Sequence, residues 1–152
     1  MTKYTRLIAF LGKIRSAEAE TALTLVLAEF DADTGTIHLV GDDGLLHLKA
    51  HAGGIPDHLL PIIQCIAVGK GIAGLAVERQ EPVDMCNLQT DTSGDARPGA
   101  KATAVKGSIC VPMMKDGRAV GALGVATSRE REFTPEETAR LMEVGGVLAD
   151  TL

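Results

Sequence analysis

The spacing of the apolar residues changes twice along this chain, and each change limits the folds that it can form. Apolar side chains recur every three or four residues in segments 7–14 and 17–30, which is the period of an amphipathic helix. In the middle of the chain the pattern changes to alternation, which is typical of strands. A helical stripe returns in residues 141–148, after a capping box at Thr134–Glu137. Helices at both ends are therefore expected to flank a sheet.

Four of the predicted strands form two hairpins. Residues 36–40 and 46–51 alternate around a Gly/Asp turn, and residues 108–114 and 119–127 flank a second such turn. Alternation across a turn of this composition is typical of an antiparallel hairpin with one buried face. A fifth, short strand is expected at residues 82–86.

Short helices and one long polar segment connect these strands. Helices are predicted at residues 55–64 and after the glycine-rich turn 68–74, whereas residues 87–106 are almost all polar or small. A connection of that length in a compact domain is usually functional, often as a lid. The sequence therefore predicts an α+β fold: a central antiparallel sheet of five to six strands, terminal helices packed on one face, and short helices and the lid loop forming a pocket on the other.

Length and composition exclude several classes of protein. A chain of 152 residues makes one domain, 1–152, and it has no run of eighteen apolar residues and no signal-peptide segment, so we expect a cytoplasmic protein. The net charge is −5 and the basic residues do not cluster, so we expect neither nucleic acid nor membrane as a partner. Three cysteines without CxxC spacing are typical of reduced thiols.

Five segments carry a resemblance to a known family: Val68–Gly74, Glu81–Val83, Ser108–Met113, Gly121–Val125 and Phe133–Glu137. In their order and spacing they resemble a GAF domain, and the resemblance covers nearly the whole chain. GAF domains are small-molecule-sensing modules, usually attached to kinases, phosphodiesterases, diguanylate cyclases or transcription activators. No effector domain is visible here, so the chain looks like a stand-alone GAF protein or an excised sensor.

One enzyme with this fold, the free methionine-(R)-sulfoxide reductase, is a weaker alternative. The resemblance would place a cysteine at Ala73 and the catalytic cysteine in the lid, where none lies between Asn87 and Ile109. Only Cys65 matches that family's cysteines. The reductase's substrate carboxylates would fall at three positions that are not acidic here: Ser108, Gly124 and Ala126. We therefore predict that the chain is not an enzyme.

The glycine-rich segment invites comparison with a phosphate-binding loop. It lacks the spacing and the Ser/Thr of a P-loop, so we interpret it as a tight turn in which glycine supplies positive φ. Contact between Lys70 and an anionic ligand stays open.

Three histidines are candidate metal ligands because the first hairpin brings them together. With Asp42 and Asp43 at the centre of the turn, His38 lies opposite His47, and His51 shares their face. No carboxylate or cysteine joins them, so we predict no metal and interpret them as polar residues on the wet face. The other face then holds the core residues Ile37, Leu39, Leu46 and Leu48.

The resemblance also suggests two kinds of cofactor or ligand, and the sequence favours neither. A bilin pocket is rich in aromatic residues, whereas this chain has 3%. The Asn-Lys-Phe-Asp-Glu signature of cyclic-nucleotide-binding GAF domains is not recognisable. We therefore predict no cofactor and interpret the cysteines as packed, inert thiols, although Cys110 shares strand parity with Ser108.

Strand parity defines a candidate ligand pocket. The bulky residues of the second hairpin suit the core beneath the helices, and the opposite set is small, which leaves room above the sheet. A carboxylate or phosphate of the ligand could meet a basic lid residue. The resulting function is non-catalytic small-molecule sensing. The candidate residues are Leu60, Ile63, Met85 and Cys86 as walls, Arg97, Lys101 and Lys106 from the lid, and Ser108, Cys110, Gly124 and Ala126 as floor.

The alternative from a different class is a dimerisation module without a ligand. GAF domains commonly dimerise through terminal helices, and the apolar stripes of residues 7–14 and 141–148 would fit an isologous interface. We expect a homodimer formed through these helices, with or without a ligand.

Overall fold

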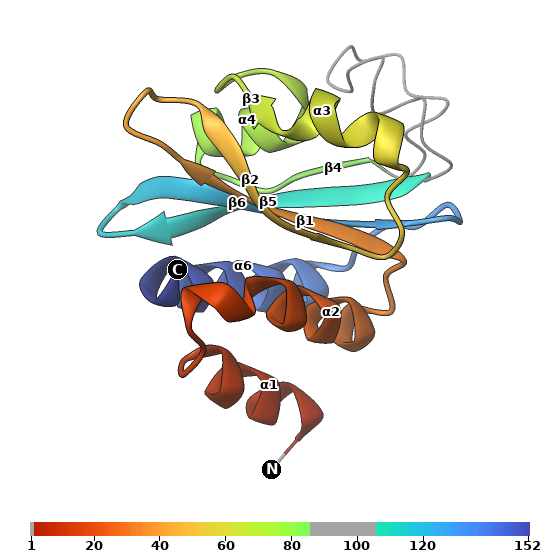
Figure 1. The fold of residues 1–152 in the computed structure, drawn as a ribbon. Coiled ribbons are helices and arrows are strands. Elements are labelled where there is room, and N and C mark those ends of the chain that lie inside the picture. Colours follow the sequence, from red (N-terminus) through yellow and green to blue (C-terminus); the bar gives the residue numbers. More distant parts are fainter. Residues whose placement is uncertain (1, 86–105) are drawn as a thin grey trace.

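A six-stranded antiparallel sheet forms the middle layer of the protein, with helices on both of its faces (Figure 1). The computed structural model describes residues 2–85 and 106–152. Cys86 and almost all of the predicted lid therefore lie outside the described residues. In chain order the elements are α1 (Lys3–Leu11), η1 (Ser16–Glu18), α2 (Ala19–Phe30), β1 (Thr34–Val40), β2 (Leu46–Ala52), η2 (Asp57–Leu59), α3 (Leu60–Ile63), β3 (Cys65–Ile66), α4 (Gly71–Arg79), β4 (Val83–Met85), β5 (Gly107–Lys115), β6 (Arg118–Thr127) and α6 (Pro135–Thr151).

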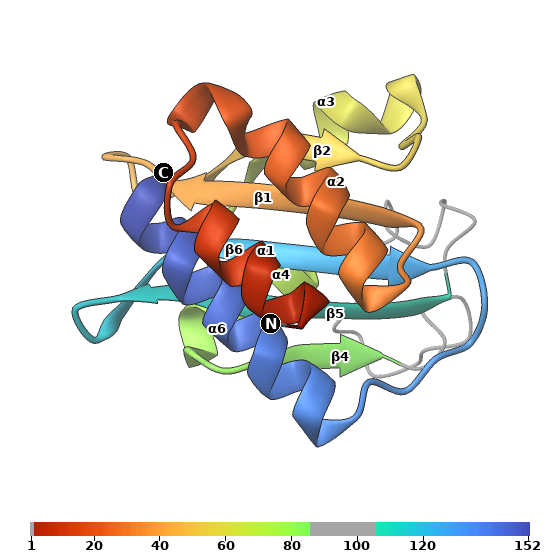
Figure 2. The ribbon, with the colours of Figure 1, turned by 90° about the horizontal axis from the view of Figure 1, so that it is seen from below.

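The helices divide between the two faces as the sequence predicts. The long helices α2 and α6 lie on one face with α1 beneath them, and the shorter α3 and α4 lie on the other (Figures 1 and 2). The strand order is β3-β2-β1-β6-β5-β4, so the two predicted hairpins meet where β1 pairs with β6. The two-residue strand β3 was not predicted, and it pairs with β2 at one edge. The α+β architecture is confirmed.

The main core lies between the sheet and the long helices. Five residues of β5 and β6 assigned to this side by strand parity are buried there, together with the α6 stripe residues Leu141, Val144 and Leu148. Burial of apolar side chains on one face of each strand is the main contribution to stability here. The five strand residues are Ile109, Val111, Met113, Leu123 and Val125.

Helix α6 begins as the capping pattern predicts. Thr134 Oγ1 accepts a hydrogen bond from the Glu137 amide at 3.1 Å, and the Glu137 carboxylate accepts one from the Thr134 amide at 3.0 Å. Arg131 pairs with the same carboxylate at 2.5 Å. These bonds hold the pKa of Glu137 below its usual value, against the effect of its burial.

The apolar stripe of helix α1 packs against other elements of the same chain. Leu7, Leu11 and Ile14 are buried in the core cluster that α2 and α6 share. The Tyr4 hydroxyl donates to the Glu143 carboxylate, and the Arg140 guanidinium lies 4.9 Å above the Tyr4 ring. Most of the residues expected to form a spare dimer stripe are therefore buried in the domain's own core, whereas Phe10 is exposed. Among the described residues, none of the helices has the length and apolarity needed to cross a membrane.

The first hairpin differs from prediction in its register. A bulge between Ile37 and His38 makes His38 pair with Leu48, and Leu39 pair with His47. The extra residue lies in β2 between Leu48 and Ala50, so residues 46–48 face the side of the sheet opposite to the one predicted. His47 therefore lies on the face opposite His38, so the prediction that three histidines share one face is wrong. Leu46 also changes sides and packs against Val77 of α4.

Candidate ligand-binding face of the sheet

The register of the central strands brings the predicted floor residues side by side. Ser108 pairs with Ala126, and Cys110 pairs with Gly124. Strand β1 extends the same two rows, because its threonines pair with Ala126 and Gly124. On this face Cys110 packs with Ile72 and Ala76 of α4. We call these six small residues the small-residue face: Thr34, Thr36, Ser108, Cys110, Gly124 and Ala126.

The small-residue face is uncharged and mostly buried. Ser108, Cys110 and Ala126 expose 8%, 8% and 9% of their surface. A Cβ added to Gly124 would lie 2.9 Å from Cys110 Sγ and 3.3 Å from Thr36 Oγ1. These two side chains therefore fill the space directly above Gly124, and the sequence did not anticipate this crowding.

The predicted walls lie on two different elements. Leu60 and Ile63 are half-buried on α3, and Met85 is buried at the end of β4, where it pairs with Ser108. Lys106 is exposed just before β5, and its amide donates to the Thr127 carbonyl at 2.8 Å. Three further candidates, Cys86, Arg97 and Lys101, fall outside the described residues.

His38 is a buried polar residue on this side of the sheet that sequence reasoning placed in solvent. Its side chain is 2% exposed, and Nε2 lies 2.7 Å from the Ile63 carbonyl oxygen. Burial holds the pKa of His38 below its usual value, so the ring is neutral, and Nε2 must carry the proton that it donates to Ile63. Nδ1 is then a buried acceptor, and no described residue donates to it. A histidine inside the apolar run Ile37–Val40 was the only sequence signal.

The buried His38 predicts a pH dependence of stability. Because the folded-state pKa lies below the unfolded value of 6.5, protonation favours unfolding, and His38 lowers stability as the pH falls below that value. Between about pH 7.5 and about pH 5, the wild type should lose more free energy of unfolding than His38→Gln, which keeps a donor for Ile63. Urea unfolding at each pH measures this. Parallel curves for both proteins would contradict the buried neutral ring.

The two described cysteines have opposite environments. Cys65 is exposed on β3, whereas Cys110 is buried, and burial raises its pKa to about 12. A thiol with so high a pKa forms almost no thiolate at neutral pH and is a poor nucleophile.

Alkylation should separate these two thiols. In the folded protein, iodoacetamide is expected to modify Cys65 within minutes and to leave Cys110 unmodified until denaturant is added. Peptide mass spectrometry reports each site, and Cys65→Ser serves as the control. Equal labelling of Cys110 under native conditions would show that the small-residue face opens to solvent.

His47 has a structural partner in the hairpin turn. Its Nε2 lies 2.8 Å from the Asp43 carboxylate, which also accepts the Leu45 amide at 3.0 Å. These bonds hold the pKa of Asp43 below its usual value. Within residues 2–85 and 106–152, no three His, Cys, Asp or Glu side chains are grouped so that they could hold a metal ion.

The glycine-rich turn has the conformation predicted for it. Gly69 and Gly71 have φ values of 87° and 65°, which L side chains rarely adopt. The Gly69 amide donates to the Gly74 carbonyl at 2.9 Å, which closes the turn onto the start of α4. Lys70 is exposed there. The glycines are explained by the backbone alone.

Comparison with known protein families shows the family to which this fold belongs. A family model of the GAF domain matches residues 17–152. The chain belongs to the GAF domain family. No curated protein sequence matches it significantly.

Solved structures with this GAF fold include a GAF domain of a phosphotransferase and free methionine-R-sulfoxide reductases. The GAF domain from Acinetobacter phosphoenolpyruvate-protein phosphotransferase has a TM-score of 0.81 and 18% identity, over 98% of this chain and 89% of that chain. Free methionine-R-sulfoxide reductase from Neisseria meningitidis has a TM-score of 0.80 and 18% identity, over 97% of this chain and 84% of that chain. The type II enzyme from Thermoplasma acidophilum has a TM-score of 0.75 and 20% identity, over 95% of this chain and 94% of that chain. At these identities the likeness shows the fold, and the fold does not separate the two functions.

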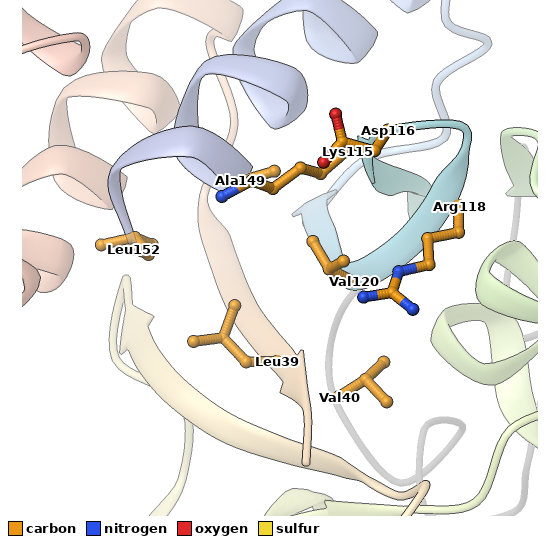
Figure 3. Close-up of a pocket in the computed structure, with 8 residues that line it drawn as sticks. All are labelled: Leu39, Val40, Lys115, Asp116, Arg118, Val120, Ala149 and Leu152. Carbon is orange, nitrogen blue, oxygen red and sulfur yellow. The ribbon is translucent and has the colours of Figure 1, made fainter. Parts of the chain in front are cut away.

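This GAF domain also has a cleft that the sequence did not predict. It lies at the C-terminal end of α6, has a volume of about 340 Å³, and contains none of the predicted site residues. Figure 3 shows Lys115 running beside Ala149, and the Arg118 guanidinium lying near Val120. The other lining residues are Leu39, Val40, Asp116 and Leu152.

Proposed function

We propose that this GAF domain is a non-catalytic sensor that binds a small molecule on the small-residue face. The observation that carries the proposal is the register, which brings Ser108, Cys110, Gly124 and Ala126 side by side on the sheet face opposite the main core, where Cys110 packs with α4. Small side chains on a covered sheet face are suited to a compact and largely apolar ligand. Leu60 and Ile63 would enclose it from α3. A basic lid residue (Arg97, Lys101 or Lys106) would meet an acidic group of the ligand.

The chemistry of the described residues supports binding without catalysis. A sulfoxide reductase needs an activated thiolate, and Cys110 is the only described cysteine on the small-residue face, where burial keeps it protonated. Cys65 is exposed on an edge strand. The positions of the reductase carboxylates hold neutral residues here, which leaves no described acid to supply protons on this face.

A turnover assay tests the non-catalytic part of this proposal. Free methionine-(R)-sulfoxide is incubated with the protein and dithiothreitol, and methionine is quantified. No turnover above the buffer rate is expected. Turnover that is lost in any of the single variants Cys65→Ser, Cys86→Ser or Cys110→Ser would overturn it. A known reductase run in parallel shows that the assay works.

Homodimerisation through the terminal helices is a second proposal, with a narrower surface than the sequence suggested. Most residues of the predicted stripes are buried in the domain's own core, so an interface on α1 would use the members that face outward, such as Phe10, which is 39% exposed. Sedimentation velocity of the wild type and of Phe10→Asp tests this. A concentration-dependent dimer that is lost in Phe10→Asp is expected, and a monomer at all concentrations would exclude the interface.

A further inference from the structure

The Nδ1 atom of His38 is a buried acceptor, and its lack of a partner among residues 2–85 and 106–152 needs an explanation. Buried polar atoms in folded proteins are nearly always hydrogen-bonded, because an unmet acceptor in a water-free environment costs free energy. The ring cannot turn to satisfy Nδ1 without losing the 2.7 Å bond from Nε2 to the Ile63 carbonyl. The hydrogen-bond acceptor is therefore held in a fixed direction by α3.

His38 stands next to the small-residue face. It lies two residues along β1 from Thr36 and shares its side of the sheet, and it pairs with Ala122, which packs beneath α4. His38 and Gly124 are diagonal neighbours on adjacent strands, close enough for one small bound molecule to contact both. The acceptor and the small-residue face can therefore contact one ligand.

The chemistry of the neighbouring groups limits what the partner of Nδ1 can be. A neutral imidazole nitrogen without a proton accepts a hydrogen bond and cannot donate one. The six residues of the small-residue face carry no charge, so nothing on it would compensate an ionic group placed against His38. The complementary group is an uncharged N–H or O–H donor.

We infer that His38 is the specificity-determining acceptor of this domain's ligand site, and that the ligand presents an uncharged N–H or O–H group to Nδ1. The inference rests on the proposed function, since it assigns the ligand chemistry of the same face. It names a residue that the sequence placed in solvent, and a ligand class that the fold alone does not specify. A buried water molecule on Nδ1 is the competing explanation, because internal waters commonly satisfy such atoms.

Two matched probes separate these explanations. The lactam 2-pyrrolidone carries one N–H donor, and N-methyl-2-pyrrolidone has a similar shape without it. Both are titrated into protein labelled with ¹⁵N, while the imidazole nitrogens of His38 and the backbone amides of Ser108 and Ala126 are observed by NMR. The His38→Gln variant assigns the imidazole signals.

The inference predicts a free acceptor that the donor probe alone engages. Without probe, His38 Nδ1 should resonate as an unprotonated nitrogen free of a hydrogen bond. The lactam should shift it towards the hydrogen-bonded position and bind about three- to tenfold more tightly than its N-methyl partner, which is the range that one hydrogen bond provides.

Three outcomes would overturn the inference. The first is an Nδ1 signal already at the hydrogen-bonded position without probe, which would identify a water or a group of the chain as its partner. The second is equal binding of both probes at Ser108 and Ala126 without movement of Nδ1, in which case the small-residue face binds molecules but His38 does not select them. The third is no perturbation by either probe. Failure of the proposed function is measured separately, by the absence of any bound molecule in the purified protein.

Discussion

Gly74→Ala is expected to destabilise the domain by about 1–3 kcal/mol, although alanine is the better helix former. Gly74 lies in α4, and a Cβ there would lie 2.5 Å from the Ala67 carbonyl oxygen and 3.1 Å from the Gly69 amide nitrogen. Both are backbone atoms of the turn that precedes the helix, so neither can move aside as a flexible side chain would. The helix must shift away from the turn, which also weakens the bond between Gly69 and Gly74.

Gly146→Ala provides the matched control within the same domain. Gly146 is also helical, and nothing lies within 4 Å of a Cβ added to it. This variant should stabilise the protein by about 0.5–1 kcal/mol through helix propensity and a less flexible unfolded chain. Urea unfolding of both variants measures the difference. If Gly74→Ala were as stable as Gly146→Ala, the glycine would have to be explained by something other than backbone packing, such as a ligand.

Leu123→Ala should have the largest effect on stability, a loss of about 2–5 kcal/mol. Leu123 is fully buried at the centre of β6, where it pairs with Ile37 on one side and Val111 on the other. All three belong to the core beneath α2 and α6. Truncation leaves a cavity that the rigid central strands cannot close, so both the lost burial and the cavity contribute.

Leu25→Ala serves as the control, because Leu25 is 42% exposed on α2. Its expected change is within about 0.5 kcal/mol. Chemical denaturation followed by circular dichroism gives both values. Similar losses for the two leucines would contradict the assignment of the main core to the helix-covered face.

The parts of the fold that could be predicted are those determined by residues close together in the sequence. The second hairpin keeps a regular register from Gly107 to Met113, and its bulge lies beyond them near the turn, so the sides of Ile109 and Cys110 follow from parity alone. Helix α6 carries its own start signal at Thr134 and Glu137. Both predictions were confirmed because each depends on residues close together in the sequence.

The first hairpin shows where local reasoning fails. Its bulge between Ile37 and His38 leaves no mark on the alternation pattern, yet it reverses the side on which Leu46 and His47 lie. The burial of His38 depends on a helix that begins more than twenty residues later, whose Ile63 carbonyl accepts a hydrogen bond from Nε2. Such a contact is decided by tertiary packing, which periodicity does not report.

The candidate site could likewise be predicted only in part. Strand parity correctly grouped Ser108, Cys110, Gly124 and Ala126, and the register confirms that they are neighbours. The crowding above Gly124 depends on the side-chain directions of Cys110 and Thr36, which parity does not give. Function is harder to predict than the fold, because the GAF domain of a phosphotransferase and a sulfoxide reductase have the same fold, and only side chains distinguish them.

Native mass spectrometry of the freshly purified protein tests the central claim, that the small-residue face binds a small molecule. The wild type is compared under gentle and denaturing conditions, alongside Ala126→Leu, which fills the face with a larger side chain. We expect a discrete added mass on the wild type that disappears on denaturation and is missing from a folded Ala126→Leu. A wild type whose native and denatured masses per chain agree, or an added mass that Ala126→Leu retains, would contradict it.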